Sequence, residues 1–433
     1  MKTKVAGAQT GDERFDLGEN LIMNKYWLGA AAPAFALLCL TSAFANDIPA
    51  ADAPATDSAP PGFKISGHIE AGITGNPDSP RDGLNYGQLF TDKSNQLLVN
   101  QAMLTAEQPL DPKATGYDFG FRLQAMAGTD ARYSHFLGEF DKSISDRYQL
   151  DLVEANVQAH LPWVSEGGID VKFGQYVTPL GYETIDATAN PFYSHSYMFN
   201  FGIPLKHTGG YLTAHLSDTL DLYLGGDTGV NTTIGGGVGG PSFLGGVGLN
   251  ALLDGKLTVL ALTHIGPADP SNSVGFDANT ALRYINDAVL TYKASDTWSY
   301  TTDLNYIRDD GFNAQAFGIA QYVSYTLDDT VTLNGRAEIY RDSNGFFVAA
   351  FPHPLDFVNA ESGLPGTVIS AGPATYGALT AGISYKPAMP DNLPTVMLRP
   401  ELRWDHTLSG TKAFDSGTST DQVTLAVDLV VSF

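Results

Sequence analysis

Residues 423–433 read VTLAVDLVVSF, and apolar and polar side chains alternate along this segment. One set of alternate positions holds Val423, Leu425, Val427, Leu429, Val431 and Phe433. The residues at the positions between them include Thr424, Ala426, Asp428 and Ser432. Because successive side chains of a β-strand point to opposite faces, this alternation predicts a strand with one apolar and one polar face.

The same alternation recurs along the chain. The segments that show it lie near 63–73, 96–107, 117–127, 149–161, 169–177, 210–217, 219–227, 243–253, 256–265, 281–294, 297–307, 315–326, 330–341, 376–386, 395–406 and 421–433. Several are 9–13 residues long, which is enough to cross a bilayer at a tilt of about 45°. The pattern therefore predicts about sixteen strands, with 14 or 18 as the alternatives.

The connections between these segments alternate in length. Long connections follow the odd-numbered segments, as at 74–95, 128–148, 178–209 and 342–375. Short ones follow the even-numbered segments, as at Ser217-Asp218 and Asp328-Asp329. Outer-membrane barrels have long extracellular loops and short periplasmic turns. We therefore expect an all-β fold, a closed antiparallel transmembrane β-barrel.

Composition agrees with a wall that faces lipid. Only 16% of the 433 residues are charged, whereas soluble domains carry roughly 25%. The formal net charge is −23, which disfavours nucleic acid as a partner because a phosphate binder needs a basic surface. The sequence offers no run of eighteen apolar residues after position 45, so no transmembrane helix is expected there.

The N-terminal part has the features of a secretory signal. Residues 28–40 read LGAAAPAFALLCL and carry no charge, Lys25 precedes them and Ala43-Phe44-Ala45 follows. A basic flank, a short apolar stretch and small residues before a cleavage site are typical of an exported protein. We expect 1–45 to be an N-terminal extension with signal peptide, 46–62 an Ala- and Pro-rich periplasmic linker, and 63–433 the barrel. Met1 and Met23 both remain candidate start residues.

Several short segments carry a family resemblance. Residues 173–183 read FGQYVTPLGYE, and Asn190-Pro191 and PLKHTG at 204–209 follow. Further segments are GTDAR at 128–132, RAE at 336–338 with Arg341-Asp342, and RPELR at 399–403. Together they resemble the OmpL-like β-barrel porin family over residues 63–433. The resemblance implies a porin-like barrel in the bacterial outer membrane and brings no catalytic residues or cofactor with it.

Barrels of about sixteen strands leave an aqueous channel, so the polar strand faces are expected to line a lumen. The basic residues assigned to it are Lys64, Arg122, Lys172, Arg283, Lys293, Arg336, Arg399 and Arg403. The acidic ones are Glu70, Asp118, Glu154, Asp170, Asp221, Asp287, Asp303, Glu338, Glu401, Asp405 and Asp428. Eight positive and eleven negative charges sum to 8 − 11 = −3, which predicts a weakly cation-preferring or nearly unselective pore.

The connection 178–209 is the candidate constriction. Its aromatic residues are too many for a loop simply exposed to water: Tyr182, Phe192, Tyr193, Tyr197, Phe199 and Phe201. Its polar groups include Glu183, Asp186, His195, Lys206 and His207. We expect it to fold into the channel, with its aromatic rings on the inner wall. The alternative, that it covers the barrel mouth or contacts another subunit, carries equal weight.

The sequence therefore favours a non-enzymatic porin that passes small hydrophilic solutes or ions by diffusion. The alternative is a non-conducting surface protein, an adhesin or receptor that uses its long loops. The nine histidines are scattered, and neither a catalytic group nor a metal site is predicted. Expected partners are outer-membrane lipid and lipopolysaccharide, and the barrel assembly machinery through Phe433. By analogy with porins of this size a homotrimer is a further expectation.

Overall fold

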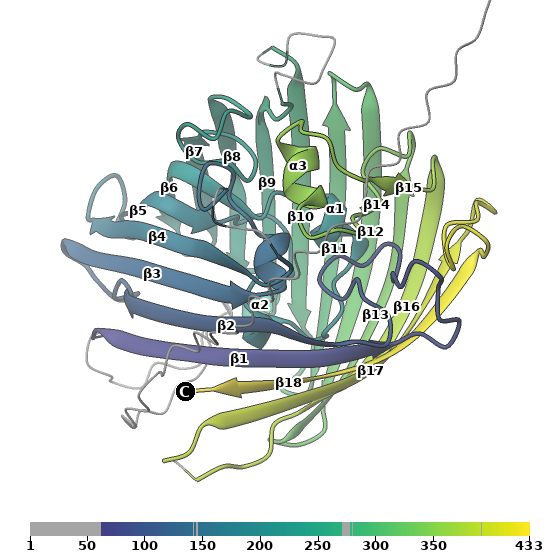
Figure 1. Cartoon of the computed structure of the whole chain (residues 1–433). Coiled ribbons are helices and arrows are strands. Elements are labelled where there is room, and N and C mark those ends of the chain that lie inside the picture. Colours follow the sequence, from purple (N-terminus) through teal and green to yellow (C-terminus); the bar gives the residue numbers. More distant parts are fainter. Residues whose placement is uncertain (1–61, 142, 144–145, 271–277, 279, 391) are drawn as a thin grey trace, which may run out of the picture. The chain divides into compact units, whose positions relative to one another are not determined.

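A computed structural model describes residues 62–433 except 142, 144–145, 271–277, 279 and 391. In this described part, sixteen strands form one closed barrel (Figure 1). This confirms the all-β fold class and, of the three strand counts considered, sixteen. The expected signal peptide and most of the expected linker fall in residues 1–61, outside the described residues.

The barrel strands follow the predicted segments closely. They are β1 (Lys64–Gly75), β2 (Leu97–Gln108), β3 (Asp118–Gly128), β4 (Gln149–Leu161), β5 (Ile169–Val177), β6 (Lys206–Ser217), β7 (Leu220–Asp227), β8 (Ser242–Ala251), β9 (Leu257–Pro267), β10 (Leu282–Lys293), β11 (Trp298–Asp309), β12 (Ala314–Thr326), β13 (Val331–Asp342), β16 (Ala374–Tyr385), β17 (Thr395–Thr407) and β18 (Asp421–Ser432).

Each barrel strand pairs in antiparallel fashion with its neighbours in sequence order, and β13 pairs directly with β16. The barrel closes where β1 pairs with β18. At this seam Gly67 and the C-terminal Phe433 exchange two backbone hydrogen bonds of 2.9 Å. Closure gives every strand two partners, which the bilayer interior requires because it offers no water to unpaired backbone groups.

The two faces of the wall differ as the sequence alternation predicts. On β18, Leu425 is 57% exposed, whereas Asp428, three residues on, is 1% exposed. Large apolar side chains such as Ile69, Phe119 and Leu304 are likewise exposed on other strands. In a membrane this exposed apolar surface faces lipid, and the buried polar side chains face the interior of the barrel.

The remaining elements lie in the connections. They are η1 (Asp130–Arg132), η2 (Ala187–Ala189), α1 (Tyr197–Phe201), α2 (Leu252–Gly255), α3 (Asp356–Glu361) and the two-residue strands β14 (Ala349–Ala350) and β15 (Ile369–Ser370), which pair with each other. Among the described residues, no helix has the length and apolar character needed to cross a membrane.

One predicted boundary is wrong. The connection after β5 was expected to run to residue 209, but β6 begins at Lys206. The expectation treated Gly209 as a loop residue, whereas it pairs with β5 and β7. An added Cβ at Gly209 would lie 2.3 Å from the carbonyl oxygen of Gly226. The glycine therefore allows a close approach of neighbouring strands, and Lys206 and His207 belong to the wall.

Candidate functional site

The connection between β5 and β6, residues 178–205 and hereafter the inner loop, folds into two short local structures. Asp186 caps η2 by accepting a hydrogen bond from the Thr188 amide. Ser196 caps α1 by accepting one from the Phe199 amide. Such side-chain caps satisfy the free amides at the start of a helical turn. They give the loop a defined shape between its two anchoring strands.

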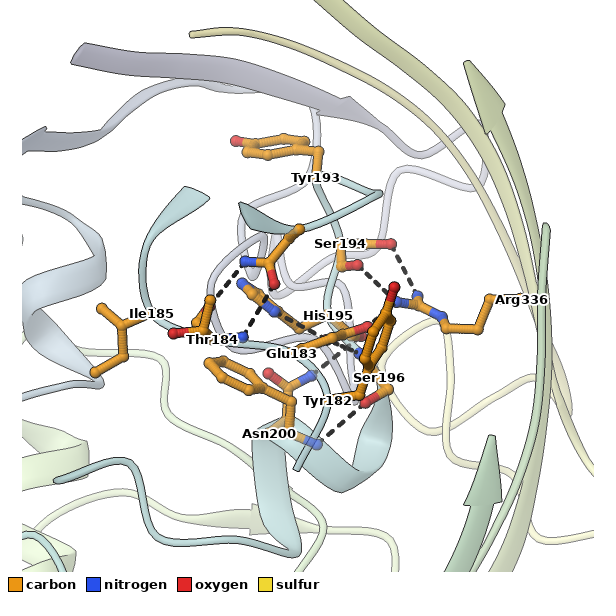
Figure 2. A network of polar contacts seen from close by, with 12 residues as sticks. Tyr182, Glu183, Thr184, Ile185, Tyr193, Ser194, His195, Ser196, Asn200 and Arg336 are labelled. Atoms are coloured by element: carbon orange, nitrogen blue, oxygen red, sulfur yellow. Dashed lines mark hydrogen bonds and ion pairs between the residues drawn. The ribbon is translucent and has the colours of Figure 1, made fainter. Parts of the chain in front are cut away.

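Glu183 is the centre of the polar contacts in this loop (Figure 2). Its Oε1 accepts hydrogen bonds from Arg336 Nη1 at 2.7 Å and from the Tyr322 hydroxyl at 2.9 Å. Its Oε2 lies 3.0 Å from His195 Nδ1 and accepts a bond from the Ser196 amide at 2.9 Å. The carboxylate thus joins the two arms of the loop to strands β12 and β13.

The surroundings of Glu183 strongly favour the ionised form of its carboxyl group. Burial alone would raise the pKa of this carboxyl, but the Arg336 guanidinium, His195 and the Ser196 amide outweigh it and lower the pKa to about 2. Glu183 is therefore ionised at neutral pH, when its negative charge is matched by the buried Arg336.

Backbone amides of the inner loop are bound by carboxylates of the wall. The Gly181 amide donates to Asp287 on β10 at 2.9 Å, and the Tyr182 amide donates to Asp303 on β11 at 3.2 Å. Further along, the amides of Tyr193 and Ser194 both donate to Glu401 on β17, and the Tyr197 amide donates to Glu338 on β13. Four predicted lumen acids thus bind the loop.

Backbone carbonyls of the loop are bound by guanidinium groups of the same wall. Arg399 donates to the carbonyls of Ala187 and Asn190, each at 2.8 Å. Arg403 donates to the carbonyl of His195 at 2.6 Å. Both arginines are also paired with carboxylates, Arg399 with Asp428 and Glu70 and Arg403 with Asp405. The buried charges are therefore compensated while they hold the loop.

Aromatic packing adds to these polar contacts. The Tyr197 ring stacks on Tyr376 with ring centres 5.0 Å apart, and it lies 6.1 Å from Tyr340. All three rings are completely buried. Tyr376 and Tyr340 belong to β16 and β13, so a loop aromatic packs on the interior face of the strands. The inner loop also contacts β2, where Gln101 donates to the Ile185 carbonyl at 2.7 Å and Asn100 accepts a hydrogen bond from the Tyr193 hydroxyl at 2.8 Å. Its contacts therefore cover a continuous part of the barrel, from β10 through β18 to β1 and β2, which we call the covered wall.

Other interior polar groups remain less buried. Arg122 on β3 pairs with Glu107 and Glu154, and its side chain is 29% exposed. On β5, Asp170 is 38% exposed at its side chain and contacts His215 of β6. Lys172 is half-buried, near the Tyr211 ring. We call this sector, β3 to β7, the open wall.

The remaining predicted residues occupy separate positions. Arg283 on β10 is paired with Asp269 and Asp309 near the start of that strand. Asp186 bonds within its own turn and lies 3.7 Å from His68. Lys206 is buried and paired with Asp151 of β4. The structure therefore joins Glu183 and His195 in one network, while Asp186, Lys206 and Arg283 lie outside it.

One group of contacts was not anticipated. Arg132 of η1 is completely buried and binds the carbonyls of Phe351, His353 and Pro354 in the connection after β13. It also pairs with Asp92. Three long connections are thus held together on one arginine. The sequence signal for this contact is the GTDAR segment at 128–132, one of the segments that carry the family resemblance.

Comparison with known families gives one match. The family described as "Putative beta-barrel porin-2, OmpL-like" matches residues 62–433, nearly all of the described chain. The chain belongs to this OmpL-like porin family. The match confirms the resemblance inferred from the short segments. No curated protein sequence matches the chain.

Solved structures place the OmpL-like barrel among outer-membrane porins by fold. The OmpF of Salmonella typhi, solved in complex with daunomycin, aligns with a TM-score of 0.54 and 12% identity over 86% of this chain and 98% of that one. An anion-selective porin from Comamonas acidovorans aligns with a TM-score of 0.53 and 11% identity over 86% and 99%. The trimer form of OmpT from Vibrio cholerae has a TM-score of 0.50 and 10% identity over 86% and 99%.

Proposed function

We propose that this protein is an outer-membrane porin through which small hydrophilic solutes or ions diffuse passively, and that the inner loop constricts the channel. The observation that carries the proposal is the uneven burial of the interior. On the covered wall the side chains of Arg336, Arg403 and Asp405 are completely buried. On the open wall, by contrast, the charged side chain of Asp170 is 38% exposed.

The permeation path then runs along the open wall. Arg122, Lys172 and Asp170 would face the passing solute, because they are the less buried of the predicted lining residues. The charges of the covered wall bind the loop instead. A charged group that is paired with an opposite charge contributes little to the electrostatic potential that a distant passing ion experiences.

Planar-bilayer conductance of the purified barrel tests this function. Replacing residues 184–203 with a short Gly-Ser linker removes α1 and most contacts of the loop, so single-channel conductance should increase. An unchanged conductance would show that the loop does not narrow the path. Complete absence of channels in the unmodified protein would favour the alternative, a surface protein that uses its long loops.

Cysteine labelling locates the path. The chain has one cysteine, Cys39, which lies in the predicted signal peptide, so each introduced thiol would be unique in the exported barrel. Lys172→Cys and Gln158→Cys place a thiol on the open wall, and Thr380→Cys places one on the covered wall as the matched control. A charged thiosulfonate should reduce conductance in the first two only. Equal effects at all three positions would contradict the assigned path.

We further propose a weak cation preference, because the assigned lumen charges of the open wall, Arg122 and Lys172 against Asp118, Glu154, Asp170 and Asp221, sum to 2 − 4 = −2, close to the −3 of the whole lumen assignment. A reversal potential measured across a salt gradient tests it, and strong anion selectivity would contradict it.

We propose that the protein forms a homotrimer in a membrane that contains lipopolysaccharide. We also propose that the barrel assembly machinery recognises the C-terminal Phe433. The trimer form of OmpT from Vibrio cholerae supports the assembly only by likeness of fold. The mass of the detergent-solubilised protein tests the trimer. Slower membrane assembly of a Phe433→Ala variant tests the role of the C-terminus.

A further inference from the structure

Three strands bring together a group of side chains that the sequence holds far apart. His207 lies at the start of β6, Asp227 at the end of β7 and His264 near the end of β9. Long connections join the strands at these ends, which is the extracellular side in an outer-membrane barrel. Asp227 pairs in register with Gly209, two residues after His207, and the neighbouring Leu244 of β8 pairs with His264.

The three side chains converge within a short distance. His207 Nδ1 lies 3.3 Å from Asp227 Oδ2, and His264 Nε2 lies 3.0 Å from Asp227 Oδ1. One possible ligand atom from each residue lies within 4.8 Å of the others. Over the described residues this is the one group of three or more such side chains that meets the distance criterion for holding a metal ion. All three are buried.

We propose that His207 Nδ1, the Asp227 carboxylate and His264 Nε2 bind one divalent first-row transition ion. Bonds of about 2.0–2.2 Å to nitrogen and oxygen in a tetrahedral site place neighbouring ligand atoms roughly 3.3 Å apart. The observed separations of 3.0 and 3.3 Å lie close to this value. Three protein ligands leave a fourth position for water or another small ligand.

Surrounding groups orient two of the ligands. The other nitrogen of His207, Nε2, lies 3.0 Å from the Thr178 hydroxyl, and Asp227 Oδ1 accepts a hydrogen bond from the Gly229 amide at 2.8 Å. Contacts of this kind fix ring orientation and carboxylate position in metal sites. The His207 and His264 rings lie 4.7 Å apart. This arrangement already holds both imidazoles against one carboxylate.

The donor set indicates the class of ion. Calcium and magnesium prefer oxygen ligands, whereas two imidazoles with a carboxylate suit zinc, nickel, cobalt, copper or ferrous iron. Zinc is the probe of choice because it has no redox chemistry and accepts this donor set.

The site lies where the two ends of the inner loop meet the wall. Thr178 begins the inner loop, and His207 follows its last residue by two positions. An ion bound here would join both ends of the loop to β7 and β9. Metal binding would therefore fasten the base of the inner loop to the wall, independently of whether the channel conducts.

Zinc binding to the refolded barrel tests the proposal. Competition with a chromophoric chelator should give one zinc ion per chain. His207→Gln, Asp227→Asn and His264→Gln should each weaken zinc binding by more than about tenfold, since even loss of an outer contact costs roughly that much. His406→Gln is the matched control, because His406 also contacts a carboxylate, Asp421 at 2.8 Å, without a second imidazole. It should bind zinc like the unmodified protein.

A spectroscopic measurement keeps the test independent of variant folding. X-ray absorption at the zinc edge of the unmodified barrel should show two imidazole nitrogens and oxygen ligands. Absence of stoichiometric binding, a spectrum without imidazole ligands, or equal weakening by the His406 control would each overturn the site. Each variant is compared only after gel electrophoresis shows that it is a folded barrel, which migrates differently before and after heating.

Discussion

Arg336 Nη1 on β13 lies 2.7 Å from Glu183 Oε1 in the inner loop, and both side chains are buried. The same guanidinium donates to the carbonyl of Ser194, on the other arm of that loop (Figure 2). One wall residue therefore holds two loop segments that are eleven residues apart. Loss of either partner leaves a buried charge without compensation, which is costly.

Glu183→Gln should loosen the inner loop. The substitution keeps the size of the side chain but leaves the Arg336 charge with less compensation, a cost on the order of 3 kcal/mol for a buried pair. We expect a lower urea midpoint and larger, noisier single-channel conductance. Asp186→Asn is the control, because Asp186 bonds within its own turn. Equal behaviour of the two variants would contradict the central role of Glu183.

Acid should release this contact only at very low pH. Because the pKa of Glu183 is lowered to about 2, its contribution is complete above the ordinary glutamate pKa of about 4.3 and is lost as pH falls toward 2. Conductance should therefore stay constant from pH 7 to pH 5 as far as this pair is concerned. An opening transition near pH 5 that Glu183→Gln abolishes would contradict the assignment.

Asp269 should make the barrel less stable as pH rises. Burial raises the pKa of Asp269 to about 7; Arg283 opposes the shift and Asp309 adds to it. The folded barrel thus keeps a proton that the unfolded chain loses near pH 3.9, so stability falls between about pH 4 and pH 7. Asp269→Asn should lose less stability than the unmodified protein between pH 5 and pH 8, measured by urea unfolding. If the stability of the variant and of the unmodified protein changed identically with pH, Asp269 would not be the group that titrates.

A charge on the outer face should destabilise the membrane-inserted barrel. Leu425 on β18 is 57% exposed, and Leu364 in the connection after β13 is 52% exposed. Leu425→Arg should cost about 2–4 kcal/mol in lipid if it lies near the bilayer midplane, and Leu364→Arg close to nothing. Unfolding in vesicles measures both. Similar costs for the two variants would show that β18 does not face lipid there.

Gly209→Ala should disturb the β6–β7 pairing. The new methyl group would lie 2.3 Å from the Gly226 carbonyl oxygen and 2.6 Å from Asp227 Cα. Backbone atoms must move to admit it, which typically costs about 1–3 kcal/mol. Gly116→Ala is the matched control, because a Cβ there meets no atom within 4 Å. The two urea midpoints decide the matter, and a Gly209 variant as stable as the control would refute the close approach.

The barrel could be predicted because its physical cause is local and repeated. In a wall between lipid and a polar interior, strands such as 421–433 must alternate, and the sequence shows this directly. The start of β6 was missed because a glycine such as Gly209 usually signals a turn. Here it permits a close contact between strands, which becomes visible only when the neighbouring Gly226 carbonyl is placed beside it.

The site was harder to predict because its contacts leave little trace in the sequence. Glu183 and Arg336 could be named as candidates, but their pairing spans 153 residues. His207, Asp227 and His264 converge only through the register of four strands, β6 to β9. Histidines that look scattered in sequence can therefore share a site when each stands at the same end of its strand.

The inner loop is held mainly through its peptide groups. Asp287, Asp303 and Glu401 accept hydrogen bonds from its amides, and Arg399 and Arg403 donate hydrogen bonds to its carbonyls. Peptide groups are common to all residues except for the missing amide hydrogen of proline. Many side chains of the loop can therefore be replaced while its backbone keeps the hydrogen bonds to the covered wall. The covered wall could thus bind loops of different sequence. If the inner loop constricts the channel as proposed, substitutions in the loop alone could change which solutes pass.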